Sequence, residues 1–407
     1  MDYKDYKLKL REQVLQRMDY SKDLKDEEVL SIIDEVVLEQ EDYKLLPVSI
    51  SRKLRGELFD SLRRLDVLQH FVEDTTITEI MINGPNHIFV EKAGVLRKQE
   101  QVFESEEKLR DVIQQIVAGC NRVVNEASPI VDARLENGSR VNIVMAPVAL
   151  NGPIVTIRRF PDKPIDIQQL IENHSITAQA ADFLKTLVRA KYNIFISGGT
   201  GSGKTTFLNV LSGFIPKNER IITIEDSAEL QLQGLENLVR LETRNKTTEG
   251  CAEISIRELI KCSLRMRPDR IIVGEVRGAE AADMITCLNT GHEGSLSTGH
   301  ANSAADMLGR LETMILMGAS IPLEAIRRQI ASGIDILVHL GRIRDGTRKV
   351  LEILEVLGYE NGEFLLKPLF VFEEEGEDEQ GCILGQLKKK GDLVHEKKLL
   401  AAGLQLL

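Results

Sequence analysis

Apolar residues in the first 70 positions recur at intervals of three and four, a spacing that places them along one side of an amphipathic helix. Two runs follow this pattern: Val29, Ile32, Ile33, Val36 and Val37, and then Leu54, Leu58, Leu62 and Leu65. Pro47 and Ser49 lie between the two runs. The pattern predicts a helical N-terminal region over residues 1–70, which is either a packed bundle or a docking surface.

The pattern changes near Thr75, where short apolar runs alternate with turn residues. Residues 78–82 and 87–91 flank the sequence NGPN and predict a β-hairpin. An amphipathic helix is expected to open at Ser105, and further strands are expected around the Asn-Gly turns at 137–138 and 151–152. We therefore expect a smaller α+β domain over residues 71–160, followed by a linker at 161–167 that contains two prolines.

From about residue 168, strand and helix patterns alternate, which favours a mainly parallel sheet flanked by helices. The predicted fold class is therefore α/β, and this larger domain covers residues 168–407. Its last part contains two expected strands, at 350–356 and 363–370. Six carboxylates follow within residues 373–379, and a run of like charges is typical of a solvated loop.

The composition narrows the possible functions. The 407 residues carry a net charge of −11, contain no tryptophan and include only 4% aromatic residues. Such a chain lacks the overall basic field of a general nucleic-acid binder and the aromatic platforms on which single strands stack. The five cysteines never occur as C-x-x-C, which argues against a zinc site or a disulfide framework.

The first ten residues lack the apolar core of a signal peptide, and no window approaches 18 uninterrupted apolar residues. We therefore expect a cytoplasmic protein that associates with the inner face of the cell membrane only through partners.

The most specific chemical signal is the segment from Gly198 to Thr205, GGTGSGKT, which matches G-x-x-x-x-G-K-[ST] in full. An apolar run precedes it and a helix is expected to follow it. Glycines let backbone N–H groups surround an anion, a lysine reaches the β- and γ-phosphates, and the last hydroxyl binds Mg²⁺. The expected cofactors are ATP and Mg²⁺, held by Gly199, Thr200, Gly201, Ser202, Gly203, Lys204, Thr205 and Thr206.

Carboxylates follow two apolar runs, because residues 221–224 end in Glu225-Asp226 and residues 270–274 end in Glu275. The carboxyl ends of parallel strands border the binding crevice of an open α/β sheet, so we expect Glu225 and Glu275 to hold Mg²⁺ and orient the attacking water. For Asp226, a functional role and an ordinary surface position are equally compatible with the sequence. Gly274 stands just before Glu275, where a Walker B strand usually has an aspartate, and this leaves Mg²⁺ binding open.

Two histidines lie among small residues in the segment 290–302. This composition suits a tight loop that senses a phosphate. His300 is interpreted as functional, whereas His292 is as easily a structural residue.

Taken together, these motifs resemble the type II/IV secretion superfamily of hexameric P-loop ATPases. The likeness rests on four ordered stretches, Gly198–Thr206, Ile224–Asp226, Ile271–Arg277 and Ser297–Asn302, and extends from about residue 75 to 345. Within the superfamily the chain is most similar to the CpaF group, which powers tight-adherence pilus assembly. The resemblance implies a RecA-like domain, a homohexameric ring and inner-membrane platform proteins as partners.

The resemblance also implies roles for individual residues. The family has Gly-Glu in its Walker B strand, so Glu275 would orient or activate water and Glu225 would support Mg²⁺ together with Thr205. His300 would sense the γ-phosphate or link subunits. Arg140 and Arg158 match positions where the family's N-terminal domain contacts phosphate, and a planar guanidinium suits that contact.

Two other functions stay open. A RecA-like motor that acts on nucleic acid would have a similar fold, but the acidic charge and the few aromatic residues argue against it. A nucleotide-gated scaffold that does not hydrolyse ATP is disfavoured because Glu225, Glu275 and His300 are all present.

Overall fold

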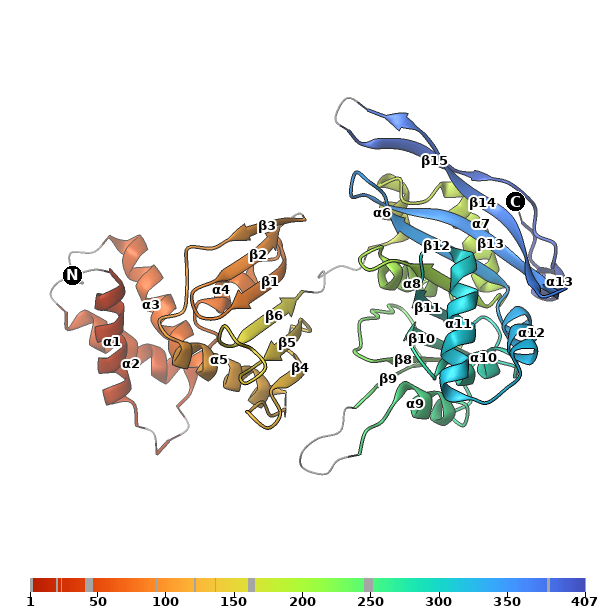
Figure 1. Ribbon diagram of the computed structural model, residues 1–407. Coiled ribbons are helices and arrows are strands. Elements are labelled where there is room, and N and C mark those ends of the chain that lie inside the picture. Colours follow the sequence, from red (N-terminus) through yellow and green to blue (C-terminus); the bar gives the residue numbers. More distant parts are fainter. Residues whose placement is uncertain are drawn as a thin grey trace. The chain divides into compact units, whose positions relative to one another are not determined.

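The computed structural model describes residues 3–19, 21–22, 24–40, 47–92, 94–120, 122–135, 137–159, 165–244, 252–378 and 381–406. The chain forms two units, Met1–Asp162 and Lys163–Leu407 (Figure 1). Residues 161–164 of the predicted linker lie outside the described residues, and Ile167, its last residue, begins a helix.

The N-terminal unit begins with three helices, α1 (Tyr3–Arg17), α2 (Asp26–Leu38) and α3 (Val48–Arg63). Their buried faces form one apolar core: Leu10, Val14, Val29, Ile33, Val36, Val37, Leu54, Leu58 and Phe59. The helical pattern in the sequence is therefore confirmed, because both apolar runs contribute to this core. An ion pair of 2.9 Å between Arg11 and Glu104 joins α1 to the segment before helix α5 (Glu106–Gly119).

The rest of this unit is a six-stranded antiparallel sheet with the strand order β3-β2-β1-β6-β5-β4, covered on one face by α5. Its elements are α4 (Leu68–Glu73), β1 (Ile77–Asn83), β2 (Ile88–Lys92), β3 (Val95–Lys98), β4 (Ile130–Arg134), β5 (Arg140–Val144) and β6 (Ile154–Arg158). The predicted hairpin is β1–β2, and Ser105 caps α5 by accepting a hydrogen bond from the Lys108 amide. The α+β content expected from the sequence is confirmed.

The C-terminal unit contains a nine-stranded sheet with the order β15-β14-β13-β12-β7-β11-β10-β8-β9. Its first six strands in sequence are β7 (Ile194–Gly198), β8 (Ile221–Glu225), β9 (Leu238–Glu242), β10 (Arg270–Val276), β11 (Leu296–His300) and β12 (Ile336–Arg342). These six pair in parallel, so the predicted α/β fold is confirmed. The remaining strands, β13 (Arg348–Glu360), β14 (Glu363–Glu377) and β15 (Ile383–Lys389), are antiparallel.

Helices cover both faces of this sheet (Figure 1). On one face lie α6 (Ile167–Glu172), α7 (Ala178–Arg189), α8 (Lys204–Ser212) and α13 (Lys397–Ala401). On the other face lie α9 (Ile256–Ser263), α10 (Ala281–Leu288), α11 (Ala304–Gly318) and α12 (Leu323–Gly333). Strand β7 is buried on both sides, since Ile194 and Ile196 contact the first layer and Phe195 contacts the second. This double burial explains its continuous apolar run.

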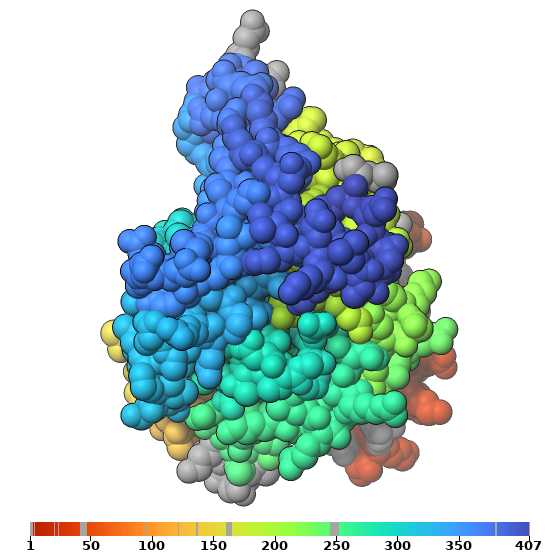
Figure 2. All heavy atoms as spheres, turned by 90° about the vertical axis from the view of Figure 1, so that its right-hand side faces the viewer, coloured from red at the N-terminus to blue at the C-terminus, as the bar shows by residue number. Residues whose placement is uncertain are grey.

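The acidic run corrects a prediction. Residues 373–377 are not a solvated loop but the second half of strand β14, which pairs with β15. Lys388 lies 3.1 Å from Glu373 and 2.9 Å from Glu375, and Arg344 contacts Glu374 and Glu377. Lys388 on β15 and Arg344 in the turn between β12 and β13 thus compensate the negative charges of this strand. The sequence of the acidic run by itself does not show these partners. Figure 2 shows the resulting β14–β15 hairpin, in dark blue, standing out from the rest of its unit.

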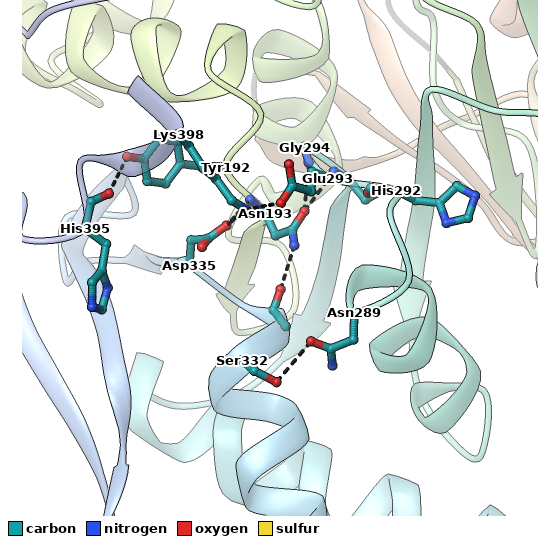
Figure 3. Close-up of polar contacts among 12 residues, drawn as sticks. Tyr192, Asn193, Asn289, His292, Glu293, Gly294, Ser332, Asp335, His395 and Lys398 are labelled. Atoms are coloured by element: carbon teal, nitrogen blue, oxygen red, sulfur yellow. Dashed lines mark hydrogen bonds and ion pairs between the residues drawn. The ribbon is translucent and has the colours of Figure 1, made fainter. Parts of the chain in front are cut away.

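The amino-terminal edge of the parallel strands is held together by Asn193, just before β7 (Figure 3). Its side-chain oxygen accepts hydrogen bonds from Gly294 and Ser295, at 2.8 and 3.2 Å, and its amide group donates to Gly333 at 2.8 Å. The Asn193 backbone N–H donates to Asp335 at 2.7 Å. The starts of β7, β11 and β12 are therefore fixed relative to one another, and so are their carboxyl ends.

Candidate functional site

The predicted phosphate-binding segment lies between β7 and α8, at the carboxyl edge of the parallel strands. Gly203 has a φ of +92°, a left-handed conformation that favours glycine, and it starts α8. A Cβ at Gly198 would lie 2.4 Å from the Leu340 carbonyl oxygen, so no other residue fits between these strands. The local backbone therefore favours glycine at 198, 201 and 203, and it places a helix N-terminus at the loop.

Lys204 contacts two groups at this edge. Its Nζ donates hydrogen bonds to the Gly199 carbonyl at 3.0 Å and to His300 Nδ1 at 3.3 Å. Only 7% of Lys204 is exposed, and this burial lowers the pKa of its ammonium group. The lysine is therefore held inside the site rather than on an exposed loop.

His300 joins Lys204 to Glu275. Its Nε2 lies 2.7 Å from Glu275 Oε1, while its Nδ1 faces the lysine. Burial lowers the pKa of His300. A neutral ring with its proton on Nε2 fits both contacts, because Nδ1 is then free to accept from the ammonium group. The Nε2 contact is not aligned as a hydrogen bond, so Glu275 Oε1 is a buried acceptor without a hydrogen-bond partner.

Glu225, at the end of β8, is 3% exposed, and burial raises the pKa of its carboxyl group. Its Oε2 accepts hydrogen bonds from the backbone N–H groups of Glu229 and Leu230, at 2.7 and 2.9 Å. Its Oε1 is buried without a hydrogen-bond partner. A buried carboxylate oxygen in this state is costly unless a ligand contacts it.

Gly274 explains the missing aspartate of the Walker B strand. A Cβ at this position would lie 2.9 Å from Glu225 Cγ. The Glu225 side chain thus occupies the space that a side chain at 274 would take, since β8 and β10 are adjacent parallel strands. The glycine accommodates a carboxylate that comes from the neighbouring strand.

The site fits a hydrated Mg²⁺ bound to phosphates. The described residues contain no group of three or more His, Cys, Asp or Glu that could hold a metal ion by themselves. Mg²⁺ usually takes one or two protein ligands and completes its coordination with water and phosphate. The free Oε1 of Glu225 and the hydroxyl of Thr205, the second residue of α8, are suited to that role.

Two cavities border the phosphate-binding loop on different sides. One is lined by Gly199, Thr200, His300 and the first turns of α11, including Arg310. The other, of about 340 Å³, is lined by Ser202, Gly203, Thr206 and Phe207, by residues near α6, and by Gly346–Val350. The first cavity has a volume of about 720 Å³, and both volumes lie in the range of small-molecule sites.

The structure adds two arginines that the motif did not reveal. The Arg277 guanidinium donates to Glu275 Oε2, through Nε at 2.9 Å and Nη2 at 2.6 Å, and lies 3.6 Å from Asp226. Arg348, at the start of β13, donates to the Gly201 carbonyl at 2.8 Å. Arg277 could have been suspected from its place two residues after Glu275, but nothing in the sequence connects Arg348 with Gly201.

Not all predicted residues meet here. His292 lies before β11, at the edge with Asn193 (Figure 3), so it is remote from the phosphate-binding loop. Arg140 and Arg158 belong to the N-terminal unit, where they face each other on β5 and β6. Arg158 also donates to Glu79 at 3.0 Å.

The chain is similar to proteins of known families. Residues 62–359 match the family described as type II/IV secretion system protein. The conjugal transfer protein TrbB of Rhizobium radiobacter is 31% identical over 79% of this chain and 96% of its own length. The type IV secretion system protein PtlH of Bordetella pertussis is 33% identical over 71% of this chain and 93% of its own length.

Among solved structures, the ATPase DotB of Legionella pneumophila has a similar fold, with a TM-score of 0.52 and 21% identity. The similarity covers 71% of this chain and 79% of DotB. In the described residues, every helix is too short or too polar to traverse a lipid bilayer.

Proposed function

Because the chain belongs to the type II/IV secretion system ATPase family, we propose that it is a motor that hydrolyses ATP to drive pilus assembly or protein secretion at the inner membrane. The observation that carries this proposal is the meeting of Lys204, His300 and Glu275 beside a complete phosphate-binding loop. The ring is proposed to be a homohexamer that contacts membrane platform proteins from the cytoplasmic side. The earlier likeness to the CpaF group favours a pilus as the product.

The mechanism assigns one task to each part of the site. Residues 199–206 hold the phosphates through backbone N–H groups, and Lys204 lies at the γ-phosphate end with His300. The cavity beside Thr206 would then hold the nucleoside. Glu275 Oε1 is buried beside His300 without an aligned hydrogen bond, so it can accept a proton from the attacking water, and Arg277 fixes the other oxygen. Thr205 and Glu225 would hold Mg²⁺, which would neutralise charge on the phosphates.

The same geometry supports a sensing role for His300. Its Nδ1 accepts from the lysine that is proposed to contact the γ-phosphate, and its Nε2 faces the proposed base. Arrival or loss of the γ-phosphate would therefore change both contacts of one ring. The His300 ring, through its contacts with Lys204 and Glu275, would therefore differ between nucleotide states.

Duplex or single-stranded DNA is expected not to stimulate ATP hydrolysis at physiological salt. The reason is the net charge of −11, which opposes binding to a polyanion. Turnover of the purified chain should be measured with and without DNA over a salt series. Strong stimulation that falls steeply with salt would favour the rival nucleic-acid motor, and no hydrolysis under any condition would favour a nucleotide-gated scaffold.

Arg140 and Arg158 are proposed to bind a phosphate group. They are directly opposite on adjacent antiparallel strands, with Arg134 opposite Arg140 on the next strand. Three arginines on adjacent strands concentrate positive charge, to which a phosphate would be attracted, although Glu79 already pairs with Arg158 at 3.0 Å. Val141 and Ile157, their neighbours in sequence, are buried on the α5 side, so the arginines lie on the outer face of the sheet.

Arg140→Ala and Arg158→Ala are each expected to lower turnover at least about tenfold while nucleotide binding stays nearly intact, because transition-state charge loses a partner. Equilibrium binding of a fluorescent ATP analogue, measured beside steady-state hydrolysis, separates the two effects. Arg97→Ala, on β3 of the same sheet, is the matched control. Normal turnover in both single variants and in the double variant would contradict this role.

A further inference from the structure

The turn between β12 and β13, residues 343–347, connects the phosphate-binding loop with the β14–β15 hairpin. Within the turn, Gly346 donates to the Ile343 carbonyl at 2.9 Å and has a φ of +83°. Residues on its C-terminal side, up to Val350, line the cavity that also contains Gly203 and Thr206. The turn is therefore one wall of the proposed nucleotide site.

Arg348, the residue after the turn, contacts the phosphate-binding loop. Its Nε donates to the Gly201 carbonyl at 2.8 Å, and a Cβ at Gly203 would lie 3.5 Å from its Cδ. Glycine-rich loops lose much conformational freedom when they become ordered. A hydrogen bond that fixes the Gly201 carbonyl therefore pre-organises the loop, and pre-organisation increases affinity for a ligand.

The opposite side of the turn is fixed by the hairpin. The Arg344 guanidinium donates to Glu377 at 2.7 Å and to Glu374 at 2.8 Å. Asp345 accepts from the Ile383 backbone N–H at 2.8 Å and, with its other oxygen, from the Thr347 N–H at 2.7 Å. These hydrogen bonds lower the pKa of Asp345, so it is ionised at neutral pH. The contacts hold both strands of the hairpin against the turn.

We propose that Arg348 is a positioning residue for the phosphate-binding loop, and that the β14–β15 hairpin supports it through Arg344 and Asp345. The proposal rests on ATP binding by residues 199–206. It gives the acidic half of β14 a function, because Glu374 and Glu377 are the carboxylates that reach the turn. A partner that binds the β14–β15 hairpin would thereby change the affinity of the motor for its nucleotide.

Three variants test the connection. Arg348→Ala removes the contact with Gly201, and Arg344→Ala removes the contact between turn and hairpin. Lys388→Ala is the matched control, since it breaks ion pairs with Glu373 and Glu375 inside the hairpin and leaves the turn intact. The dissociation constant of a fluorescent ATP analogue should be measured with Mg²⁺, together with kcat, KM and the thermal unfolding midpoint of the nucleotide-free chain.

Arg348→Ala is expected to raise the dissociation constant and KM about tenfold with a smaller change in kcat, and Arg344→Ala to raise them about threefold. Lys388→Ala should bind like wild type, because its ion pairs lie within the hairpin and do not reach the turn. Both effective variants act through one contact, so the double variant should bind about as weakly as Arg348→Ala alone. Arg348→Lys should recover part of the affinity, since an ammonium group can also donate to Gly201.

The proposal is overturned if Arg344→Ala binds like Lys388→Ala, if Arg348→Ala binds like wild type, or if the two effects add. Should Arg348→Ala unfold below the assay temperature, the comparison of Arg344→Ala with Lys388→Ala decides by itself. If the wild-type chain fails to bind ATP, the proposed function fails as well. If wild type binds and Lys204→Ala does not, normal binding by the turn variants contradicts only the present inference.

Discussion

Replacing Lys204 by alanine is expected to reduce ATP hydrolysis to below about a tenth of the wild-type rate, because loss of a phosphate clamp raises the barrier by more than about 1.4 kcal/mol. Lys204 is 7% exposed and its ammonium group is already oriented by Gly199 and His300, so no neighbouring side chain replaces it easily. Its loss also removes the partner of His300 Nδ1.

The fold is expected to survive this change. Burial lowers the pKa of Lys204, which means that the folded chain disfavours its charge when no phosphate is bound. The nucleotide-free variant should therefore unfold at the wild-type temperature or above it. Lys217→Ala, an exposed lysine of the same unit, is the matched control and should hydrolyse ATP normally. Turnover above about a tenth of wild type in folded Lys204→Ala would refute the assignment of the site.

Glu275→Gln is expected to bind ATP and to lose about 10²–10⁴-fold in turnover, the usual contribution of a general base. Arg277 donates two hydrogen bonds to Oε2, so the glutamine carbonyl oxygen will take that position. Its NH₂ group then replaces Oε1 and faces the N–H of His300, where it can neither accept a proton nor orient water. Single-turnover hydrolysis of pre-bound ATP measures the loss.

Glu225→Gln is the comparison that separates the two carboxylates. The N–H groups of Glu229 and Leu230 will hold the glutamine oxygen at the Oε2 position, which turns the NH₂ group toward the proposed metal site. An amide N–H cannot bind Mg²⁺, so the Mg²⁺ concentration for half-maximal activity should rise about tenfold, with reduced turnover at saturation. Identical Mg²⁺ titrations for both variants would contradict the assignment of Mg²⁺ binding to Glu225 and of proton transfer to Glu275.

The sequence predicted those parts of the site that are local in the chain. The loop from Gly198 to Thr205 encodes its own geometry, since the glycines, the preceding strand and the following helix are contiguous. Glu225 and Glu275 were found because each ends an apolar run, and parallel pairing then places both at one edge. Their roles in hydrolysis stay predictions until the variants are measured.

Contacts between distant residues could not be predicted in this way. Arg348 meets Gly201 only because β12 pairs with β7 and the next turn folds over the loop. The acidic half of β14 looked like a loop because its compensating cations lie on β15 and in the 343–347 turn. In both cases a stabilising partner lies in a strand, turn or loop that is distant in the sequence, which a pattern of charges along one segment does not reveal.

The packing of Gly274 against Glu225 also limits the order in which these positions can change. An aspartate at 274 would place its Cβ 2.9 Å from Glu225 Cγ, inside a carboxylate that two backbone N–H groups hold in place. A shorter residue at 225, such as aspartate, would therefore have to be introduced first, and that residue still carries a carboxylate. Introduced in the opposite order, the aspartate at 274 would push the Glu225 carboxylate away from the N–H groups of Glu229 and Leu230.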